Sequence, residues 1–212
     1  MSIAALILAG GQGSRLGYVD KAFLSLDDRP LVARLLERLA PQVDAIAISA
    51  NGDPSRFAPW PHPVLADAPD HAGKGPLAGL AAGLAWAAHI GAATLLTVPV
   101  DTPFAPRNLV PALSPAPAVA CYGGRQHHLV AHWPVTVRPA LEDFLRRPGA
   151  HRVRDALALC AARPVEFPGP IDPFLNINTP DDLAAARALW KKEKEEAAFW
   201  GLLGFKGFPW SG

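Results

Sequence analysis

The sequence predicts an α/β protein, a Rossmann-like three-layer α/β/α sandwich with a mainly parallel sheet. Short continuous apolar runs alternate along the chain with segments whose apolar residues recur at helical spacing. The first apolar run is followed at once by a glycine-rich turn, which is typical of a buried strand in a parallel sheet. The 23 prolines among 212 residues are spread singly, and we interpret them as loop and helix-end signals.

The first half of the chain supplies the alternation. Residues 3–8 form the first apolar run, and residues 31–39 (LVARLLERL) follow Pro30 with four leucines on one helical face. Further strands are predicted over 43–49, 63–66 and 93–98, and an alanine-rich helix over 77–89. Ligands of such sheets bind at the carboxyl ends of the strands, so the loops after these strands are the expected site.

The second half is less regular. Strands are predicted over 118–122 and 128–133, with a hairpin turn over 122–127. Helices are predicted over 135–146, 153–162 and 180–190, the last with Thr179 as its N-cap.

Composition excludes several classes of protein. The 20 Lys and Arg nearly balance 19 Asp and Glu, which argues against general affinity for nucleic acid. No stretch of 18 residues is apolar throughout, which argues against a membrane span and against a secretory signal. Cys121 and Cys160 lie far apart without a CxxC motif, so we expect free thiols and a reducing cytoplasm.

Residues 1–190 are predicted to be a single domain, and residues 191–212 a C-terminal charged and aromatic tail. The charged run 191–196 (KKEKEE) is compatible with an extension of the last helix. The aromatic residues after it would suit contact with another subunit, a partner protein or a membrane surface, or have no role at all.

The glycine-rich segment 8–21 (LAGGQGSRLGYVDK) carries the strongest chemical signal. Its glycines let the backbone curl and point N–H groups inward, as a phosphate-binding loop requires. Arg15 and Lys21 add donors suited to phosphate oxygens, whereas a mobile linker is the alternative. The spacing fits neither the GxxxxGK[ST] phosphate loop nor the GxGxxG dinucleotide fingerprint.

Asp101 is the second candidate, in the segment 98–104 (VPVDTPF) after a predicted strand. Pro99 and Pro103 stiffen the turn and fix the direction of the carboxylate. Mg²⁺ is usually held by one or two carboxylates together with substrate phosphates, so Asp101 is a candidate ligand. The alternative is a turn residue that bonds its own backbone.

Two further segments carry weaker signals. Residues 72–79 (AGKGPLAG) open the alanine-rich helix, and small residues such as Gly75 allow a ligand close to the helix N-terminus. In residues 174–182 (FLNINTPDD), alternation along a strand places Asn176 and Asn178 on one side. These amides either contact a ligand or order the turn into the last helix.

The motifs at 8–21, 75–79, 98–104 and 176–183, in this order and at these separations, resemble the molybdenum cofactor guanylyltransferases of the nucleotide-diphospho-sugar transferase superfamily. ISANGD at 48–53 and HHLVAHW at 127–133 extend the resemblance, which covers about residues 3–190. It implies the nucleotide-diphospho-sugar transferase fold and a nucleotidyltransferase domain over 1–190. The implied reaction is the transfer of GMP from GTP to Mo-molybdopterin, with release of pyrophosphate.

The candidate site is inferred from the resemblance together with the residue types in the loops. Arg15, Lys21 and Asp101 are the candidate catalytic residues, and Asp101 is the candidate ligand of Mg²⁺, or of Mn²⁺ in its place. The candidate residues for binding GTP and the pterin substrate are Leu8, Ala9, Gly10, Gly11, Gly13, Lys21, Asn51, Asp67, Gly75, Asp101, Asn176 and Asn178. Related sugar nucleotidyltransferases often carry a second metal-binding aspartate where this chain has Asn178, which leaves one carboxylate for the metal.

GTP and Mo-molybdopterin are the expected substrates of a monomer or weak homo-oligomer. A GTP-binding helper protein and acceptor molybdoenzymes are the expected partners. One alternative is a related nucleotidyltransferase that uses CTP on molybdopterin or acts on a sugar or alcohol phosphate. Another is a non-catalytic protein that binds and delivers the nucleotide or cofactor.

Overall fold

The computed structural model describes residues 2–10, 12–13, 19–149 and 151–202. Its strands are β1 (Ile3–Leu8), β2 (Gln12–Gly13), β3 (Val19–Asp20), β4 (Ser25–Leu26), β5 (Arg29–Pro30), β6 (Ala45–Ser49), β7 (Val64–Leu65), β8 (Thr94–Pro99), β9 (Ala118–Tyr122), β10 (Arg125–Pro134) and β11 (Arg163–Glu166). Its α-helices are α1 (Leu31–Leu39), α2 (Pro76–His89), α3 (Leu109–Leu113), α4 (Arg138–Arg146), α5 (Val153–Leu159) and α6 (Pro180–Leu202).

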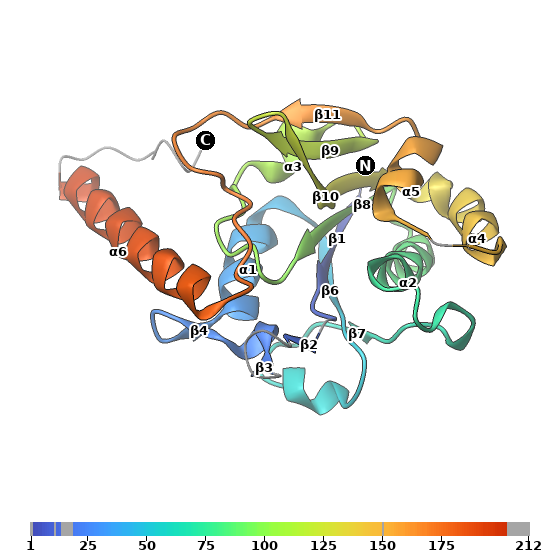
Figure 1. Ribbon diagram of the computed structural model, residues 1–212, viewed down its shortest axis with the longest axis horizontal. Helices are drawn as coiled ribbons and strands as arrows, with labels where there is room; N and C mark the ends of the chain where they lie inside the picture. Colours follow the sequence, from blue (N-terminus) through green and yellow to red (C-terminus); the bar gives the residue numbers. More distant parts are fainter. Residues whose placement is uncertain (1, 11, 14–18, 150, 203–212) are drawn as a thin grey trace.

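The predicted three-layer α/β architecture is confirmed. Seven strands form one sheet in the order β11-β9-β10-β8-β1-β6-β7. The neighbours β8, β1, β6 and β7 are parallel, and only β10 runs antiparallel, between β8 and β9. Helices α1, α3 and α6 pack on one face, and α2, α4 and α5 pack on the other (Figure 1). β1 is central because its apolar run, IAALIL, is buried on both faces.

Helix α1 matches its predicted bounds, and Leu31, Leu35 and Leu39 are fully buried in the core as expected. The second half departs from the prediction in detail. β10 begins at Arg125, so the hairpin turn shrinks to Gly123 and Gly124, whose φ angles of 56° and 76° allow a two-residue turn. The helix predicted over 153–162 ends at Leu159, and the chain enters the unpredicted edge strand β11.

Helix α6 continues through the charged run, as its sequence allowed, and packs against α1 on the way. The Trp190 ring lies under the guanidinium groups of Arg34 (4.3 Å) and Arg38 (5.4 Å). The buried Arg38 also forms an ion pair with Glu193 at 2.7 Å. Residues on both sides of position 190 therefore pack against α1, and the division of the chain there stays a prediction.

Helix α2 lies unusually close to the sheet at two glycines. A Cβ atom added to Gly83 would lie 2.5 Å from Leu6 Cδ2 and 3.1 Å from Leu95 Cδ2, and both leucines are fully buried. We expect Gly83→Ala to lower the free energy of unfolding by about 1–3 kcal/mol, because the buried leucines must leave their rotamers. Urea unfolding measures this change. An increase in the free energy of unfolding by about 1 kcal/mol, as Gly→Ala produces in an exposed helix, would contradict the close packing.

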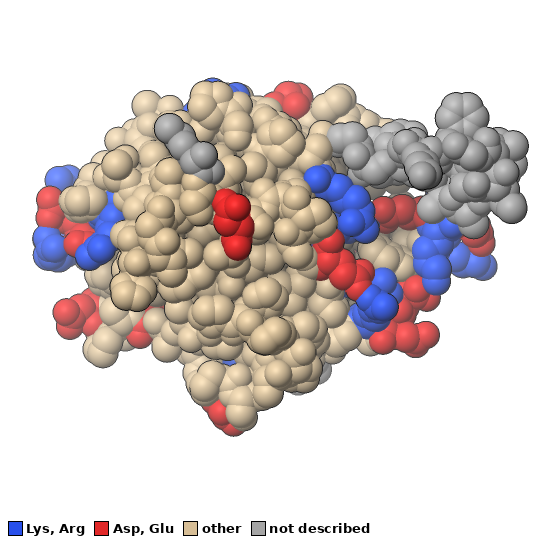
Figure 2. All heavy atoms as spheres, turned by 180° about the vertical axis from the view of Figure 1, so that it is seen from behind, with Lys and Arg blue, Asp and Glu red and all other residues tan. Residues whose placement is uncertain are grey.

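Two structural observations bear on the classes considered from composition. On the face shown in Figure 2, Lys and Arg side chains are interspersed with Asp and Glu and form no continuous positive surface. Among the described residues, no helix is both long and apolar enough to cross a membrane. Both cysteines are free, as predicted.

Candidate active site

Apart from Asn176 and Asn178, the described candidate residues lie at or after the carboxyl ends of four adjacent parallel strands. Backbone hydrogen bonds continue past these ends: Ala9 donates to Ser49 O (2.9 Å), and Val100 donates to Leu8 O (3.0 Å). The loops after β1, β6, β7 and β8 consequently open at the same edge of the sheet. This is the edge at which open parallel sheets bind ligands.

Four polar side chains from distant parts of the sequence meet at this edge. Lys21 Nζ donates to Asp101 Oδ2 at 2.7 Å and to Asn178 Oδ1 at 2.6 Å. Asn176 Nδ2 donates to Asp101 Oδ1 at 2.9 Å. Lys21 and Asp101 expose only 18% and 13% of their side chains, so solvent screens this ion pair only in part. Asp101 is therefore held by other side chains and does not cap its own turn.

The asparagine segment lies beside Asp101 without forming the predicted strand. Residues 175–178 pair with no strand, and the prediction of a strand there is wrong. The segment is held instead by one backbone bond, from Ile177 N to Asp101 O at 3.0 Å. Because Ile177 is fully buried, Asn176 and Asn178 on either side of it are directed to the site. The predicted placement of Asn176 and Asn178 on one side of the segment is correct, although the segment is not a strand.

Helix α6 begins directly after Asn178, and its cap orders the end of this segment. Asp182 Oδ2 accepts from Asn178 N (2.9 Å) and Thr179 N (2.8 Å), and Asp182 N donates to Thr179 Oγ1 (3.1 Å). The predicted Thr179 cap is confirmed as part of this reciprocal arrangement. These bonds, that from Asn178 above all, hold the pKa of Asp182 below its usual value of 3.8.

We expect Asp182→Asn to lower the free energy of unfolding at pH 7 by about 1 kcal/mol, the usual cost of a lost helix cap. Because the pKa of Asp182 is lowered in the folded state, its contribution is complete well above pH 3.8 and is lost as pH falls below it. Thermal unfolding from pH 7 to pH 3 should show the Tm gap between variant and natural protein closing. Asp181→Asn, at an exposed neighbour, is the control. A gap unchanged by pH would contradict the role of the charge.

Asn51 and Asp67 form a second pair at the same edge of the sheet. Asn51 Nδ2 donates to Asp67 Oδ2 (2.8 Å), and Asp67 N donates to Asn51 Oδ1 (2.9 Å). Arg56, which the sequence did not single out, donates to Asn51 O (2.9 Å) and forms an ion pair with Asp20. Asp20 in turn caps the 3-10 turn that begins at Lys21, through a bond from Ala22 N at 3.1 Å. Arg56 thus connects the end of the glycine-rich segment to Asn51.

The glycine-rich segment is described only in part. Leu8 and Ala9 are buried at the end of β1, and Gly10 is exposed, with space around the position of a Cβ atom. Gly13 lies in β2, which pairs with β3 next to Lys21. Gly11 and Arg15 lie outside the described residues, so their contact with phosphate stays a prediction.

The start of α2 borders the same edge. Gly75 has a φ of 59° and a ψ of −140°, a backbone conformation that favours glycine, immediately before Pro76 at the first helical position. A Cβ atom on Gly79 would lie 2.4 Å from Ser49 Oγ, so α2 sits directly against the end of β6. Lys74 Nζ lies 3.2 Å from His151 Nδ1, which joins this loop to the segment before α5.

The side chains at the candidate site could hold a metal ion only together with oxygen atoms of the substrate. Within the described ranges, no group of three or more His, Cys, Asp or Glu residues is placed to hold a metal ion. Asp101 supplies one carboxylate at the site, flanked by the amides of Asn176 and Asn178. Mg²⁺ retains waters and takes phosphate oxygens readily, so one carboxylate and a triphosphate suit it better than a cage of protein ligands.

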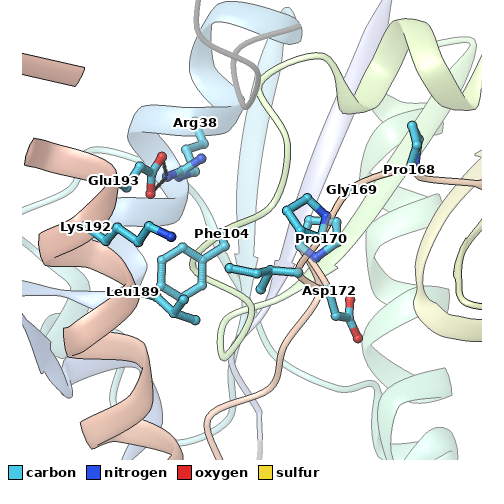
Figure 3. A pocket seen from close by; sticks show the side chains of 11 residues that line it. Arg38, Phe104, Pro168, Gly169, Pro170, Asp172, Leu189, Lys192 and Glu193 are labelled. Atoms are coloured by element: carbon cyan, nitrogen blue, oxygen red, sulfur yellow. Dashed lines mark hydrogen bonds and ion pairs between the residues drawn. The ribbon is translucent and has the colours of Figure 1, made fainter. Parts of the chain in front are cut away.

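A separate cavity of about 340 Å³ lies between α6 and the segment before the asparagines (Figure 3). Its walls come from the turn after Asp101, the segment before the asparagines, and α1 and α6. The lining residues are Arg38, Phe104, Pro168, Gly169, Pro170, Ile171, Asp172, Pro173, Leu189, Lys192 and Glu193. None of the predicted site residues that the structure describes lines it, so the described part of the predicted site and this cavity are distinct.

Comparison with known proteins places the chain among related sequences. Residues 5–162 match the MobA-like NTP transferase domain. The chain is 54% identical to a molybdenum cofactor guanylyltransferase of Acidiphilium cryptum, over 88% of this chain and 94% of the relative. It is 49% identical to one of Rhodobacter capsulatus, over 88% of this chain and 95% of that relative.

Among solved structures, the molybdopterin-guanine dinucleotide biosynthesis protein A of Archaeoglobus fulgidus superposes with a TM-score of 0.68. That structure is 22% identical in sequence, and the match covers 91% of this chain and 100% of that one. A nucleotidyl transferase of Methanothermobacter thermautotroptrophicus superposes with a TM-score of 0.70 at 18% identity, over 91% and 99% of the two chains. At these identities the two structures support the fold alone.

Proposed function

Because the chain belongs to the MobA-like NTP transferase family, we propose that it transfers GMP from GTP to Mo-molybdopterin and releases pyrophosphate. The observation that carries the proposal is the contact of Lys21 with Asp101 and Asn178 at the carboxyl ends of parallel strands. This cluster combines a cation for phosphate, a carboxylate for a metal and two amides for orientation. The names of the relatives supply the guanine base and the pterin acceptor.

In the proposed reaction a phosphate oxygen of the pterin substrate attacks the α-phosphorus of GTP. The new P–O bond forms as the bond to the bridging oxygen of the β-phosphate breaks, and pyrophosphate leaves with that oxygen. The attacking phosphate is already ionised at neutral pH, so no side chain has to remove a proton. Positioning and charge stabilisation by the protein then supply the catalysis.

Each residue of the cluster has a defined role in this proposal. Lys21 moves from Asp101 to the phosphates and offsets the charge that builds up on them. Asp101 would hold Mg²⁺, which supplies further positive charge to the triphosphate when bound. Asn176 keeps the Asp101 carboxylate oriented, and Asn178 faces the acceptor. Gly10, Gly11, Gly13 and Arg15 surround the phosphates, while Leu8, Ala9, Asn51, Asp67 and Gly75 bind the rest of GTP.

The test is pyrophosphate release by the purified protein with Mo-molybdopterin and each of the four nucleotides, with and without Mg²⁺. Release with GTP, dependent on Mg²⁺ and on the acceptor, supports the proposal. Faster release with CTP, or release with a sugar or alcohol phosphate as acceptor, would replace it with a related transfer. Tight GTP binding without turnover would identify a binding and delivery protein.

The remaining expectations about partners stay predictions. They are a GTP-binding helper, acceptor molybdoenzymes, a monomer or weak homo-oligomer, and a cytoplasmic location. Sedimentation of the purified protein at several concentrations measures the oligomeric state directly.

A further inference from the structure

His127 is a buried histidine close to the candidate site that the proposed mechanism does not use. Its side chain is 8% exposed, and its ring lies against Phe174 with centroids 5.0 Å apart. Its Nε2 atom lies 3.2 Å from Asp172 Oδ2 without the geometry of a hydrogen bond. The contact is therefore a close electrostatic one between the β10 strand and the segment that leads to the asparagines.

A bulge in β10 turns His127 toward this segment. The register between β10 and β9 shifts between Gln126 and Ala131. In this stretch His128 and Leu129, although consecutive, both lie on the α2 face of the sheet. A regular strand would place His127 on that face as well, whereas the bulge places it on the face of Phe174. Bulges beside active sites commonly redirect a side chain in this way.

Asp172 and Phe174 are the start of the segment that carries the asparagines. Asp172 Oδ1 accepts from Phe174 N at 2.8 Å, and the fully buried Phe174 ring packs edge-on against Phe167 at 5.0 Å. Two residues later Asn176 bonds Asp101. Asp172 also lines the cavity beside α6, and Figure 3 shows its side chain next to the proline segment. His127 thus contacts the fixed end of a short connection whose other end holds the Asp101 carboxylate.

We propose that His127 is a positioning residue, which orients Asn176 and Asn178 through Asp172 and Phe174. The role in turnover rests on the proposed function, whereas the effect on Asn176 does not. The charged and titratable groups around the His127 ring are Asp172, Arg125 and His128. Burial has a larger effect on the pKa of His127 than these charges have, and it lowers that pKa. The ring is therefore neutral at neutral pH. The neutral ring then faces the Asp172 carboxylate with a polar nitrogen, Nε2, at 3.2 Å.

His132 provides a matched comparison on the same strand. It is also buried, at 3% exposure, but its Nε2 lies 2.8 Å from Thr94 Oγ1. Thr94 begins β8, at the end of the strand opposite to Asp101. Replacing either histidine by Phe removes a buried ring nitrogen from β10, and only the change at 127 touches the asparagine segment.

The experiment compares His127→Phe, His127→Gln, Asp172→Asn and the double variant His127→Phe/Asp172→Asn with the control His132→Phe. The first readout is the side-chain amide signal of Asn176 in ¹⁵N-labelled protein without substrate, identified by its loss in Asn176→Ala. We expect this signal to shift or broaden in His127→Phe, to stay unchanged in His132→Phe, and to stay near its natural position in His127→Gln, which keeps a polar N–H group beside Asp172.

The second readout is steady-state turnover. We expect His127→Phe to lower kcat about tenfold and to raise the Mg²⁺ concentration for half-maximal rate, with KM for GTP changed less than twofold. The double variant should be no slower than the slower single variant, because both changes break one contact. An unmoved Asn176 signal, additive losses in the double variant, or the same losses in His132→Phe would overturn the proposal.

The two readouts separate this inference from the proposed function. If the natural protein releases no pyrophosphate with any nucleotide, the proposed function fails and the amide signal still tests the positioning. If His127→Phe does not fold, Asp172→Asn breaks the same contact from the other side and should shift the Asn176 signal, whereas His127→Gln should not; an unmoved signal in folded Asp172→Asn would overturn the proposal.

Discussion

Replacing Asp101 with Asn should lower Mg²⁺-dependent pyrophosphate release by about a thousandfold, while the protein stays folded. Asn keeps the size of the side chain and an oxygen for the bond from Asn176 (2.9 Å). It removes the carboxylate charge that we propose holds the metal, and this is the carboxylate that both Lys21 and Asn176 contact. Loss of one preorganised electrostatic group in an active site costs about 10²–10³-fold, and the metal adds to this.

The measurement is kcat with GTP and Mo-molybdopterin across a range of Mg²⁺ concentrations. Asp27→Asn is the matched control, because Asp27 also forms an ion pair with a lysine, Lys194, at 2.8 Å, but on α6 away from the site. The control should keep its activity within about twofold. Near-normal turnover in Asp101→Asn would refute the metal assignment and, with it, the proposed mechanism.

Replacing Lys21 with Met is expected to lower kcat by about 10²–10³-fold, because the stem is retained and the phosphate-binding charge is lost. The same change should strengthen metal binding to the free protein, although it lowers kcat. In the structure the Lys21 ammonium group lies 2.7 Å from Asp101 Oδ2. A metal ion that binds to Asp101 in the absence of nucleotide therefore has to displace this ammonium group. Removing that group should tighten the binding of Mn²⁺ to the free protein, measured by electron paramagnetic resonance.

Lys194→Met is the matched control for this change, since it removes a lysine from the ion pair with Asp27. It should alter neither kcat nor the affinity for Mn²⁺. If Lys21→Met weakened Mn²⁺ binding instead, Lys21 would be a structural support for the carboxylate and not its competitor. If kcat fell less than tenfold, the cation that balances the phosphates would have to lie elsewhere.

The first half of the fold is predictable because its signals are local. Pro30 and the leucine spacing define α1 residue by residue, and the apolar run of β1 needs only its own composition to indicate a buried strand. The same holds for the cluster: a lysine after a glycine-rich turn and a carboxylate after a strand are expected at one sheet edge, and Lys21 and Asp101 meet there.

The features that the sequence pattern does not indicate depend on contacts with residues far away in the sequence. The asparagine segment alternates as a strand does, but its place beside Asp101 leaves it no neighbouring strand, so one backbone bond from Ile177 replaces a ladder. Arg56 is an ordinary surface arginine until the fold brings Asp20 to it. The bulge at His127 depends on pairing with β9, which no pattern within β10 reveals.

The packing of α6 on α1 has a consequence for how the protein is made. A chain leaving the ribosome presents Arg34 and Arg38 long before Trp190 and Glu193 exist to cover them. Until α6 has emerged, this side of α1 bears guanidinium groups without their aromatic cover and their carboxylate partner. The packing of α1 is therefore completed only after α6 has been synthesised, and by then Asn176 and Asn178, which precede α6, are also able to meet Asp101 and Lys21.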